Sequence, residues 1–323
     1  MPAVLSTRPL ILVTGSNGYL GTWTVQMLLE RRYSVRAAVR TEQRGDYLRE
    51  KFRSFGEYFQ TVAVGDIEKP GAFNRAAQGV QGVIHTASPV TLAADDPQEL
   101  IIPAVNGVTG LLESAKEFGS TIQRIVLTSS CAAILDTSDK DVTVSEEDWN
   151  YERVKESAWD FVKSHDKLDW DLVVINPPWM FGPPIHDLTG PESLNPSCQL
   201  FYDALVNNEF MGMEPTEHPG HGWVDVRDVA AAHIRALESQ DAGGQRIIVS
   251  GGEWVWQDMI NAALSLPGSI YKPHADVSGP KGVTTRLIKF DTRKEKRLLG
   301  IQFRTLQEHV YDILVDYIKR GWY

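Results

Sequence analysis

The chain has 323 residues, of which 42% are hydrophobic, and a formal net charge of −10 at pH 7. This length suffices for one large domain or for a core domain with a smaller lobe, and the acidic balance argues against nucleic acid or an anionic membrane surface as a partner. Its two cysteines, Cys131 and Cys198, give no disulfide framework. We see no apolar run long enough to span a bilayer and expect a cytoplasmic protein.

A glycine motif follows the first predicted strand. The apolar run 11–14 precedes Gly15, Gly18 and Gly21, and a helical pattern then covers 22–29. The N–H groups and the positive dipole end of such a helix start attract a phosphate. Gly15 permits a tight turn, Gly18 lets the backbone approach a pyrophosphate, and Gly21 lets helix and strand pack closely. A Gly-rich connection without a ligand is the alternative, but the next apolar run, 34–39, completes a βαβ unit and favours a dinucleotide site.

The residue after the second strand bears on the choice of cofactor. An acidic residue there would bind the ribose hydroxyls of NAD, whereas this chain has Arg40, with Arg44 four positions later. A guanidinium group suits a 2′-phosphate, so we predict NADP(H). Glu42 between the two arginines is the contrary observation, and solvent-exposed loop charges are the alternative interpretation.

Short apolar runs alternate with helical patterns through the first half of the chain. Strands are predicted at 60–64, 82–85, 124–127 and 171–175, with helices near 71–78, 97–118 and 151–163. The apolar runs lack strict polar alternation, as expected when both faces of a parallel sheet are covered. Repeated strand–helix–strand units with right-handed crossovers predict an α/β, Rossmann-type doubly wound parallel sheet.

The pattern changes after Pro177, where prolines crowd the sequence up to residue 196. Alternation resumes at 223–224, followed by a helix from Asp228, its predicted N-cap, to Glu238, and by a strand at 246–250. From 252 the chain is predicted to be largely helical. We therefore assign residues 1–177 plus 223–251 to an NADP-binding domain and residues 178–222 plus 252–323 to a smaller, mostly helical substrate lobe.

Tyr151 and Lys155 have a spacing that suits proton transfer beside a nicotinamide. Four residues apart, they would share one helix face, and the ammonium group would stabilise the phenolate. Ser130, after the 124–127 strand, could hydrogen-bond a substrate oxygen as charge develops on it. Such pairs are common in helices by chance, but the glycine motif, Arg40 and Ser130 favour the catalytic interpretation.

Other polar residues at strand ends could line the cofactor groove. Asp66 could accept a hydrogen bond from the adenine amine, and residues 86–88 close the strand 82–85. The histidines His85, His218 and His221 lack metal-ligand spacing and are interpreted as structural or surface groups, so no metal site is predicted.

The substrate pocket is predicted near the nicotinamide. Cys131 has no histidine placed to activate it and is interpreted as pocket lining. The residues at 179–181 could belong to the core or to the pocket. The predicted pocket comprises Ser88, Val90, Cys131, Trp179 and Met180.

Seven segments together resemble the extended short-chain dehydrogenases/reductases. They are 13–21 (VTGSNGYLG), 39–40 (VR), 65–67 (GDI), 84–89 (IHTASP), 127–130 (LTSS), 176–177 (NP) with 181–183 (FGP), and 223–230 (WVDVRDVA). Within that family the chain is most similar to fungal NADPH-dependent aldehyde and ketone reductases, with the plant dihydroflavonol and cinnamoyl-CoA reductases as relatives.

The resemblance implies a role for individual residues. Ser130, Tyr151 and Lys155 would be the catalytic triad. The cofactor would be bound by Gly15, Gly18, Tyr19, Leu20, Gly21, Arg40, Arg44, Asp66, Ile67, Thr86, Ala87, Ser88, Tyr151, Lys155, Pro177 and Ser197.

One segment departs from the family pattern. Tyr151 directly follows Asn150, where the family usually has a further loop, and Val154 stands where serine is usual. The pair 158–159 also lies one helical turn nearer Lys155 than expected. Either the helix is shifted by one turn with Tyr151 and Lys155 in place, or the site is altered.

These observations predict an NADPH-dependent carbonyl reductase acting on an apolar or aromatic aldehyde or ketone. The expected partner is this small molecule, for a protein that is a monomer or a homodimer. A sugar-nucleotide epimerase or dehydratase with bound NAD is the first alternative, which Arg40 disfavours. A non-catalytic or redox-neutral NADP-binding protein is the second, supported by the short segment between Ser130 and Tyr151.

Overall fold

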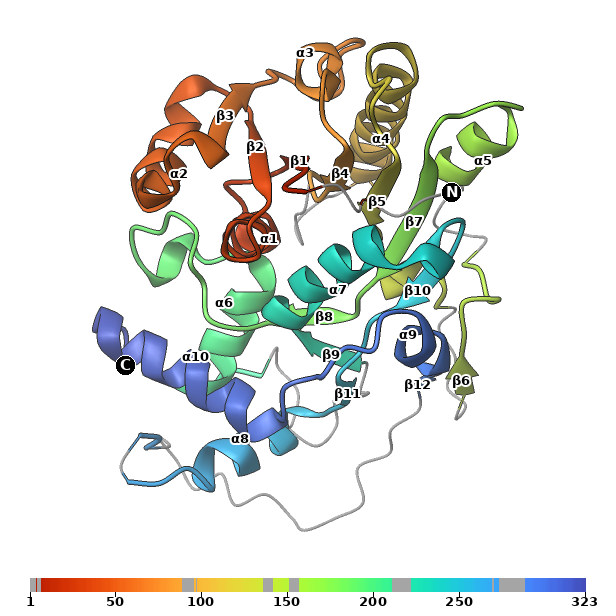
Figure 1. Cartoon of the computed structure of the whole chain (residues 1–323). Coiled ribbons are helices and arrows are strands. Elements are labelled where there is room, and N and C mark those ends of the chain that lie inside the picture. Colours follow the sequence, from red (N-terminus) through yellow and green to blue (C-terminus); the bar gives the residue numbers. More distant parts are fainter. Residues whose placement is uncertain are drawn as a thin grey trace.

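A seven-stranded parallel sheet forms the centre of the molecule in this computed structural model (Figure 1). The structure describes residues 4, 7–88, 96, 98–135, 142–150, 157–210, 222–268, 270–272 and 288–323. The strand order is β10-β7-β5-β4-β1-β2-β3. The chain adds strands outward from β1 to β3, then returns to place β4 on the other side of β1 and continues outward to β10, as in doubly wound folds. The strands are β1 (Leu10–Thr14), β2 (Ser34–Val39), β3 (Phe59–Ala63), β4 (Gly82–His85), β5 (Arg124–Thr128), β7 (Asp171–Asn176) and β10 (Arg246–Ile248).

Helices cover both faces of this sheet, as the uninterrupted apolar strands predict. One face carries α1 (Tyr19–Glu30), α2 (Asp46–Lys51) and α7 (Val226–Glu238), and the other carries α3 (Asn74–Ala77), α4 (Gln98–Phe118) and α5 (Ser157–Lys163). Successive residues of β1 point to opposite faces: Ile11 and Val13 pack in the core with α1 and α7, whereas Leu12 packs with α3 and α4. The predicted doubly wound fold is confirmed.

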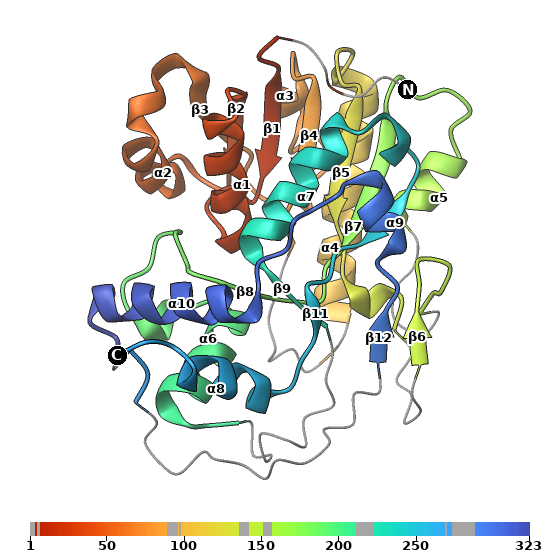
Figure 2. The same ribbon diagram turned by 60° about the horizontal axis from the view of Figure 1, so that its bottom comes forward.

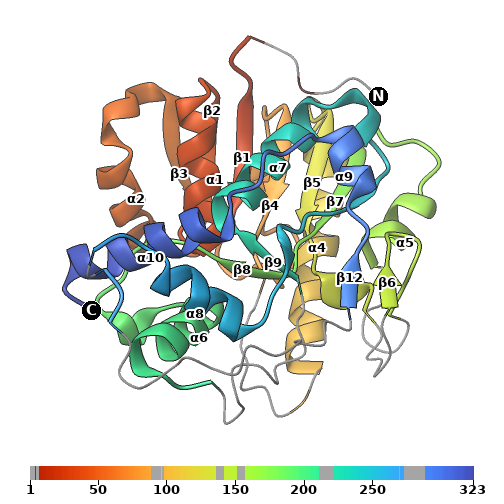
Figure 3. The same ribbon diagram turned by 90° about the horizontal axis from the view of Figure 1, so that it is seen from below.

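A second lobe lies beyond the carboxyl edge of the sheet (Figures 2 and 3). Its three-stranded sheet has the order β11-β9-β8 and packs on an aromatic core that includes Phe181, Trp223 and Trp256. The strands are β8 (Trp179–Phe181), β9 (Gly222–Asp225) and β11 (Gly252–Glu253), and the helices are α6 (Pro196–Tyr202), α8 (Trp256–Leu264) and α10 (Leu306–Arg320). A separate parallel pair, β6 (Val142–Val144) with β12 (Ile288–Phe290), lies near α9 (Arg293–Leu298) (Figure 2).

Two sequence expectations need correction. The chain after 252 is less purely helical than predicted, because β11 and β12 occur there. The predicted N-cap Asp228 is also wrong. Helix α7 begins at Val226 and is capped by Asp225, which accepts a hydrogen bond from the Arg227 N–H (2.9 Å). Asp228 instead pairs with Arg304 of the second lobe. The division into two domains stays a prediction, although β9 pairs with the second lobe's strands rather than with the main sheet.

Four consecutive carbonyl groups, at residues 182–185, accept side-chain hydrogen bonds; three of these bonds join the second lobe to α1 and α2 of the first, and the fourth, from Arg320 of α10, lies within the second lobe. Because two of these residues are prolines, the segment has few N–H groups and presents mainly acceptors. Its donors come from α1, α2 and α10: Tyr19 Oη to Gly182 O (2.9 Å), Trp23 Nε1 to Pro183 O (2.9 Å), Arg320 Nη2 to Pro184 O (2.7 Å) and Tyr47 Oη to Ile185 O (2.9 Å).

Candidate functional site

The glycine turn connects β1 to α1 at the carboxyl edge of the sheet. Gly15 has φ +63°, which favours glycine, and the Gly18 N–H donates to its carbonyl group (2.9 Å). The first intrahelical bond of α1 runs from Thr22 N to Gly18 O (2.9 Å). The N–H groups of Tyr19 and Leu20 therefore precede the helical ladder and remain at a helix N-terminus, where an anion binds well.

Hydrogen bonds join the glycine turn to the segment 86–88. Thr86 Oγ1 donates to Thr14 O (2.7 Å), and the Ala87 N–H donates to Thr14 Oγ1 (3.2 Å). A Cβ on Gly15 would lie 2.9 Å from Ala87, so only glycine allows this close approach. Thr14 Oγ1 also bonds His85 Nδ1 (2.8 Å), and burial lowers the pKa of His85 to about 4. The predicted groove residues Thr86 and Ala87 thus lie beside the glycine turn, and His85 supports them as a neutral, structural group.

The predicted 2′-phosphate residues lie just after β2. Arg40 and Arg44 are exposed, and neither forms a side-chain ion pair with the parts of the chain that the structure describes. Glu42, the contrary observation in the sequence, lies 3.6 Å from Arg49 Nη1. The negative charge of Glu42 is therefore partly balanced by Arg49 rather than by Arg40. The nearby Arg36 does not join these two residues as a phosphate-binding candidate, because its guanidinium group donates to the Ala76 and Gln78 carbonyls.

The loop after β3 reaches the same edge. The Gly65 N–H donates to Arg40 O (3.0 Å), which brings Asp66 and Ile67 beside the end of β2. Asp66 Oδ1 accepts from the Glu68 N–H (3.2 Å), and Ile67 packs against Gly107 of α4. Both predicted adenine-flanking residues are half-buried, which leaves part of each side chain accessible.

Ser130 begins a short helical turn, Cys131–Ala133, at the end of β5. Its side chain is exposed, and its Oγ accepts from the Ala132 N–H (3.1 Å). A serine hydroxyl keeps its proton when it accepts in this way, so it can donate to another oxygen. Pro177 is buried behind this turn and accepts from the Cys131 N–H (2.9 Å).

Several predicted site residues lie outside the described residues. These are Tyr151, Lys155 and Val90. His218 and His221, interpreted from the sequence as structural or surface groups, also lie outside the described residues. The helix predicted at 151–163 is described from Ser157 onward as α5. The roles of Tyr151 and Lys155 therefore stay predictions.

The other predicted pocket residues differ in burial. Cys131 is buried, its thiol donates to Asn176 O (3.2 Å), and burial raises its pKa. This burial favours a structural role over the predicted pocket-lining one. Trp179 and Met180 are half-buried and Ser88 is exposed, so these three can contact a ligand.

Ser197 lies in α6, near the segment 182–185 whose carbonyl groups accept the side-chain hydrogen bonds described above. Its neighbour Cys198 has its thiol 3.8 Å from Gly182 O, the same carbonyl that accepts from Tyr19. This arrangement brings the first turn of α6 toward the start of α1. Ser197 itself accepts from Asn195 Nδ2 (2.9 Å).

Two buried asparagines, Asn150 and Asn176, were missed by the sequence interpretation. Asn176 Nδ2 donates to Ser130 O (2.8 Å), and Asn150 Nδ2 donates to Ala132 O (3.1 Å). For Asn176 the sequence offered a signal, because this polar residue directly follows the apolar strand predicted at 171–175 and precedes Pro177.

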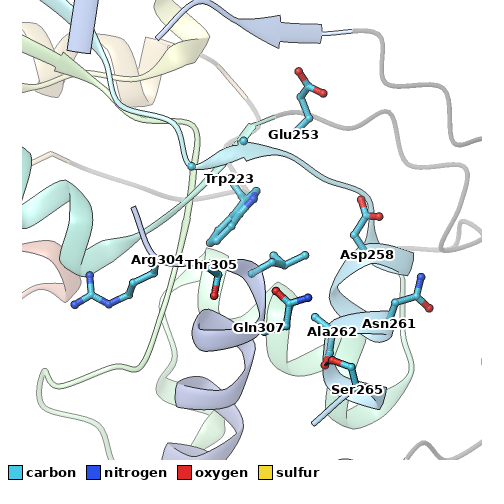
Figure 4. Close-up of a pocket in the computed structure, with 12 residues that line it drawn as sticks. Trp223, Glu253, Asp258, Asn261, Ala262, Ser265, Arg304, Thr305 and Gln307 are labelled. Atoms are coloured by element: carbon cyan, nitrogen blue, oxygen red, sulfur yellow. Dashed lines mark hydrogen bonds between the residues drawn. The ribbon is translucent and has the colours of Figure 1, made fainter. Parts of the chain in front are cut away.

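A pocket of about 480 Å³ opens elsewhere, between β11, α8 and the start of α10 (Figure 4). Its lining is mostly polar and includes Glu253, Asn261 and Gln307, with Trp223 as one wall. It shares no lining residue with the predicted site. Among the described residues, no group of three His, Cys, Asp or Glu side chains is placed to hold a metal ion, and no helix could cross a membrane.

Comparison with known proteins gives consistent matches. Residues 11–251 match the NAD dependent epimerase/dehydratase family. The chain is 32% identical to NADPH-dependent methylglyoxal reductase GRE2 of Saccharomyces cerevisiae, over 96% of this chain and 98% of that protein. It is 33% identical to ketoreductase azaE of Aspergillus niger, with the same coverages. The crystal structure of yeast Gre2 complexed with NADPH superposes with a TM-score of 0.85 at 32% identity, covering 97% of this chain and 100% of that one.

Proposed function

The chain belongs to the NAD dependent epimerase/dehydratase family, and within it we propose that it is an NADPH-dependent carbonyl reductase. One structural observation carries the proposal: the glycine turn, the exposed Arg40 and the exposed Ser130 hydroxyl lie along one carboxyl edge of the sheet. In open α/β sheets this edge binds the ligand. The similarity to NADPH-dependent methylglyoxal reductase GRE2 and to a ketoreductase supports the same reaction.

The residues present fit an NADP(H) molecule. The N–H groups at the start of α1 suit the pyrophosphate, and the exposed Arg40 and Arg44 suit a 2′-phosphate. When bound, NADPH supplies the hydride that reduces the carbonyl carbon. Asp66 and Ile67 would flank the adenine, and Pro177 would border the nicotinamide end.

The chain's own residues handle the substrate oxygen. Ser130 donates its hydroxyl hydrogen and stabilises the negative charge that develops there. Tyr151 delivers the proton, and Lys155 stabilises the phenolate and holds the ribose. The half-buried Trp179 and Met180 suit an apolar or aromatic substrate. The protein acts on this small molecule in the cytoplasm, as a monomer or a homodimer.

The proposal is tested by following NADPH and NADH oxidation with a panel of aromatic and aliphatic aldehydes, ketones and ketoesters. We expect turnover with NADPH preferred over NADH. Tight NADPH binding without turnover on the whole panel would contradict the proposal and favour a redox-neutral NADP-binding protein. Purified protein that carries bound NAD would favour an epimerase or dehydratase.

Replacing Tyr151 with phenylalanine tests the proton donor. Tyr151→Phe removes only the hydroxyl group, and we expect turnover to fall by about 10²–10⁴-fold, the usual contribution of a positioned acid. Tyr311→Phe is the control, because Tyr311 is an exposed residue of α10. Wild-type turnover in Tyr151→Phe would exclude this residue as the proton donor.

A further inference from the structure

The turn that carries Ser130 is held from two sides by buried side-chain amides. We propose that Asn150 and Asn176 are positioning residues that fix the Ser130 hydroxyl for catalysis. This inference deepens the proposed reductase function and rests on it for the catalytic consequence.

The first support comes from β7. Asn176 ends this strand, is 1% exposed, and donates Nδ2 to Ser130 O (2.8 Å). Its Oδ1 has no hydrogen-bond partner within the described residues, so the amide serves here as a donor. The Asn176 backbone carbonyl accepts from the Cys131 thiol (3.2 Å). One residue therefore contacts both Ser130 and the residue after it.

The second support comes from Asn150, which contacts the turn although it lies 18 residues after Ala132 in the sequence. Asn150 is 7% exposed. Its backbone N–H donates to Ala133 O (2.9 Å), and its Nδ2 donates to Ala132 O (3.1 Å). Both ends of the segment between Ser130 and Asn150 are thus joined. Asn150 is also the residue before Tyr151 in the sequence, so the anchor of the Ser130 turn is shared with the chain that leads to the predicted proton donor.

The segment before Asn150 is itself docked on the edge strand β10. Glu146 is buried and accepts from the Ile248 N–H (3.0 Å). The Arg246 guanidinium lies 3.3 Å from the centre of the Trp149 ring and donates to Asp148 O (3.1 Å). The residues before Asn150 are therefore held against β10, which restricts the position of Asn150 beside the turn.

These contacts matter because the Ser130 side chain is exposed and the hydrogen bond of its hydroxyl group is local. Within the residues that the structure describes, its Oγ accepts from the Ala132 N–H, two residues away. The direction of the hydroxyl group therefore depends on how the turn is held, and the two asparagine side chains contribute to this together with the bond from the Cys131 N–H to Pro177 O. A misplacement of about 1 Å at a catalytic group can lower turnover by about 100-fold.

The test uses Asn150→Ala and Asn176→Ala, each of which removes one side-chain donor to the turn. Thr121→Val is the matched control: it removes the donor to Val80 O (2.7 Å) at the opposite end of β5. We expect kcat to fall by about 10- to 100-fold in both asparagine variants, with KM for NADPH within about twofold of wild type. Thr121→Val should retain wild-type kcat.

Hydrogen exchange supplies a readout that does not require activity. The backbone N–H groups of Ala133 and Ile134 donate to Ser130 O and Cys131 O. Their exchange rates should rise in both asparagine variants and should equal the wild-type rates in Thr121→Val. Wild-type kcat together with wild-type exchange in the asparagine variants overturns the inference. If Asn176→Ala does not fold, Asn150→Ala decides alone. A wild-type protein without turnover would contradict the proposed function, while exchange would still decide whether the asparagines hold the turn.

Discussion

At the scale of single residues, we predict that the preference for NADPH over NADH depends on Arg40. Its side chain is exposed at the end of β2, and the nearby acidic residue Glu42 lies beside Arg49 instead. The sequence alone left Arg40 and Glu42 as opposing signals, because it does not say which residues pair. The structure favours the phosphate-binding interpretation by showing where Glu42 lies.

Replacing Arg40 with alanine should therefore weaken NADPH binding selectively. A hydrogen bond to a charged group contributes about 1.5–3 kcal/mol, so we expect KM for NADPH to rise by about 10- to 100-fold while KM for NADH changes little. Arg53→Ala is the control, since Arg53 is also exposed and lies near Glu50 (3.9 Å). Steady-state kinetics with both cofactors checks this, and an equal rise in both KM values would contradict the assigned role.

At the scale of elements, the contact between the glycine turn and α1 depends on Gly21. A Cβ there would overlap the Gly15 carbonyl oxygen. We expect Gly21→Ala to abolish NADPH binding or folding, because the obstructing atoms are backbone and cannot rotate away. Gly110→Ala in α4 is the control: its Cβ would meet only Ile67 O at 3.9 Å, and alanine favours a helix. Thermal unfolding and NADPH fluorescence titration check both variants.

The carboxyl-terminal end of α7 is joined to β5 and β7 by a buried ion pair. Arg124 is fully buried, forms two bonds to Asp171 (2.6 and 2.8 Å), and donates to the Ala236 and Ser239 carbonyls. We expect Arg124→Met to lower the free energy of unfolding by about 3–5 kcal/mol, because it leaves the carboxylate and two carbonyls without their donor. Breaking the exposed pair Arg53–Glu50 should change it by less than about 1 kcal/mol. Urea titration measures both, and equal effects would contradict the argument.

At the scale of the whole molecule, three buried histidines predict acid sensitivity. Burial lowers the pKa of His85, His186 and His233 to about 4 each, whereas an unfolded histidine has a pKa of about 6.5. Between these values the unfolded chain binds more protons, so stability is fully present above about pH 6.5 and decreases as the pH falls toward 4. Each histidine adds about 1.4 kcal/mol per pH unit within that window.

Urea titrations at pH 7.5, 6 and 5 check this prediction. We expect His233→Gln to reduce the pH dependence by about one proton, because this ring is buried between Thr128 Oγ1 and Val229 O (both 2.8 Å). His165→Gln, at a half-buried position two residues after α5, is the control for replacing a histidine away from these three buried rings. A free energy of unfolding that is constant from pH 7.5 to 5 would contradict the prediction.

The sequence by itself determined the strands of the parallel sheet and the position of the glycine turn. Those features are local: a short apolar run predicts a buried strand, and three spaced glycines before a helical pattern predict a tight turn. The predicted strand 82–85 matches β4 in both bounds, and 171–175 differs from β7 by one residue.

Tertiary structure alone decided which distant residues meet. Asp225 rather than Asp228 caps α7, because Asp228 is paired with Arg304, which is 76 residues away in sequence. Likewise, no local pattern indicates that Asn150 bonds the turn after Ser130, or that Tyr19 anchors Gly182. Such contacts depend on how the chain returns across the sheet edge, and they are selected by packing and hydrogen-bond satisfaction rather than by spacing in the sequence.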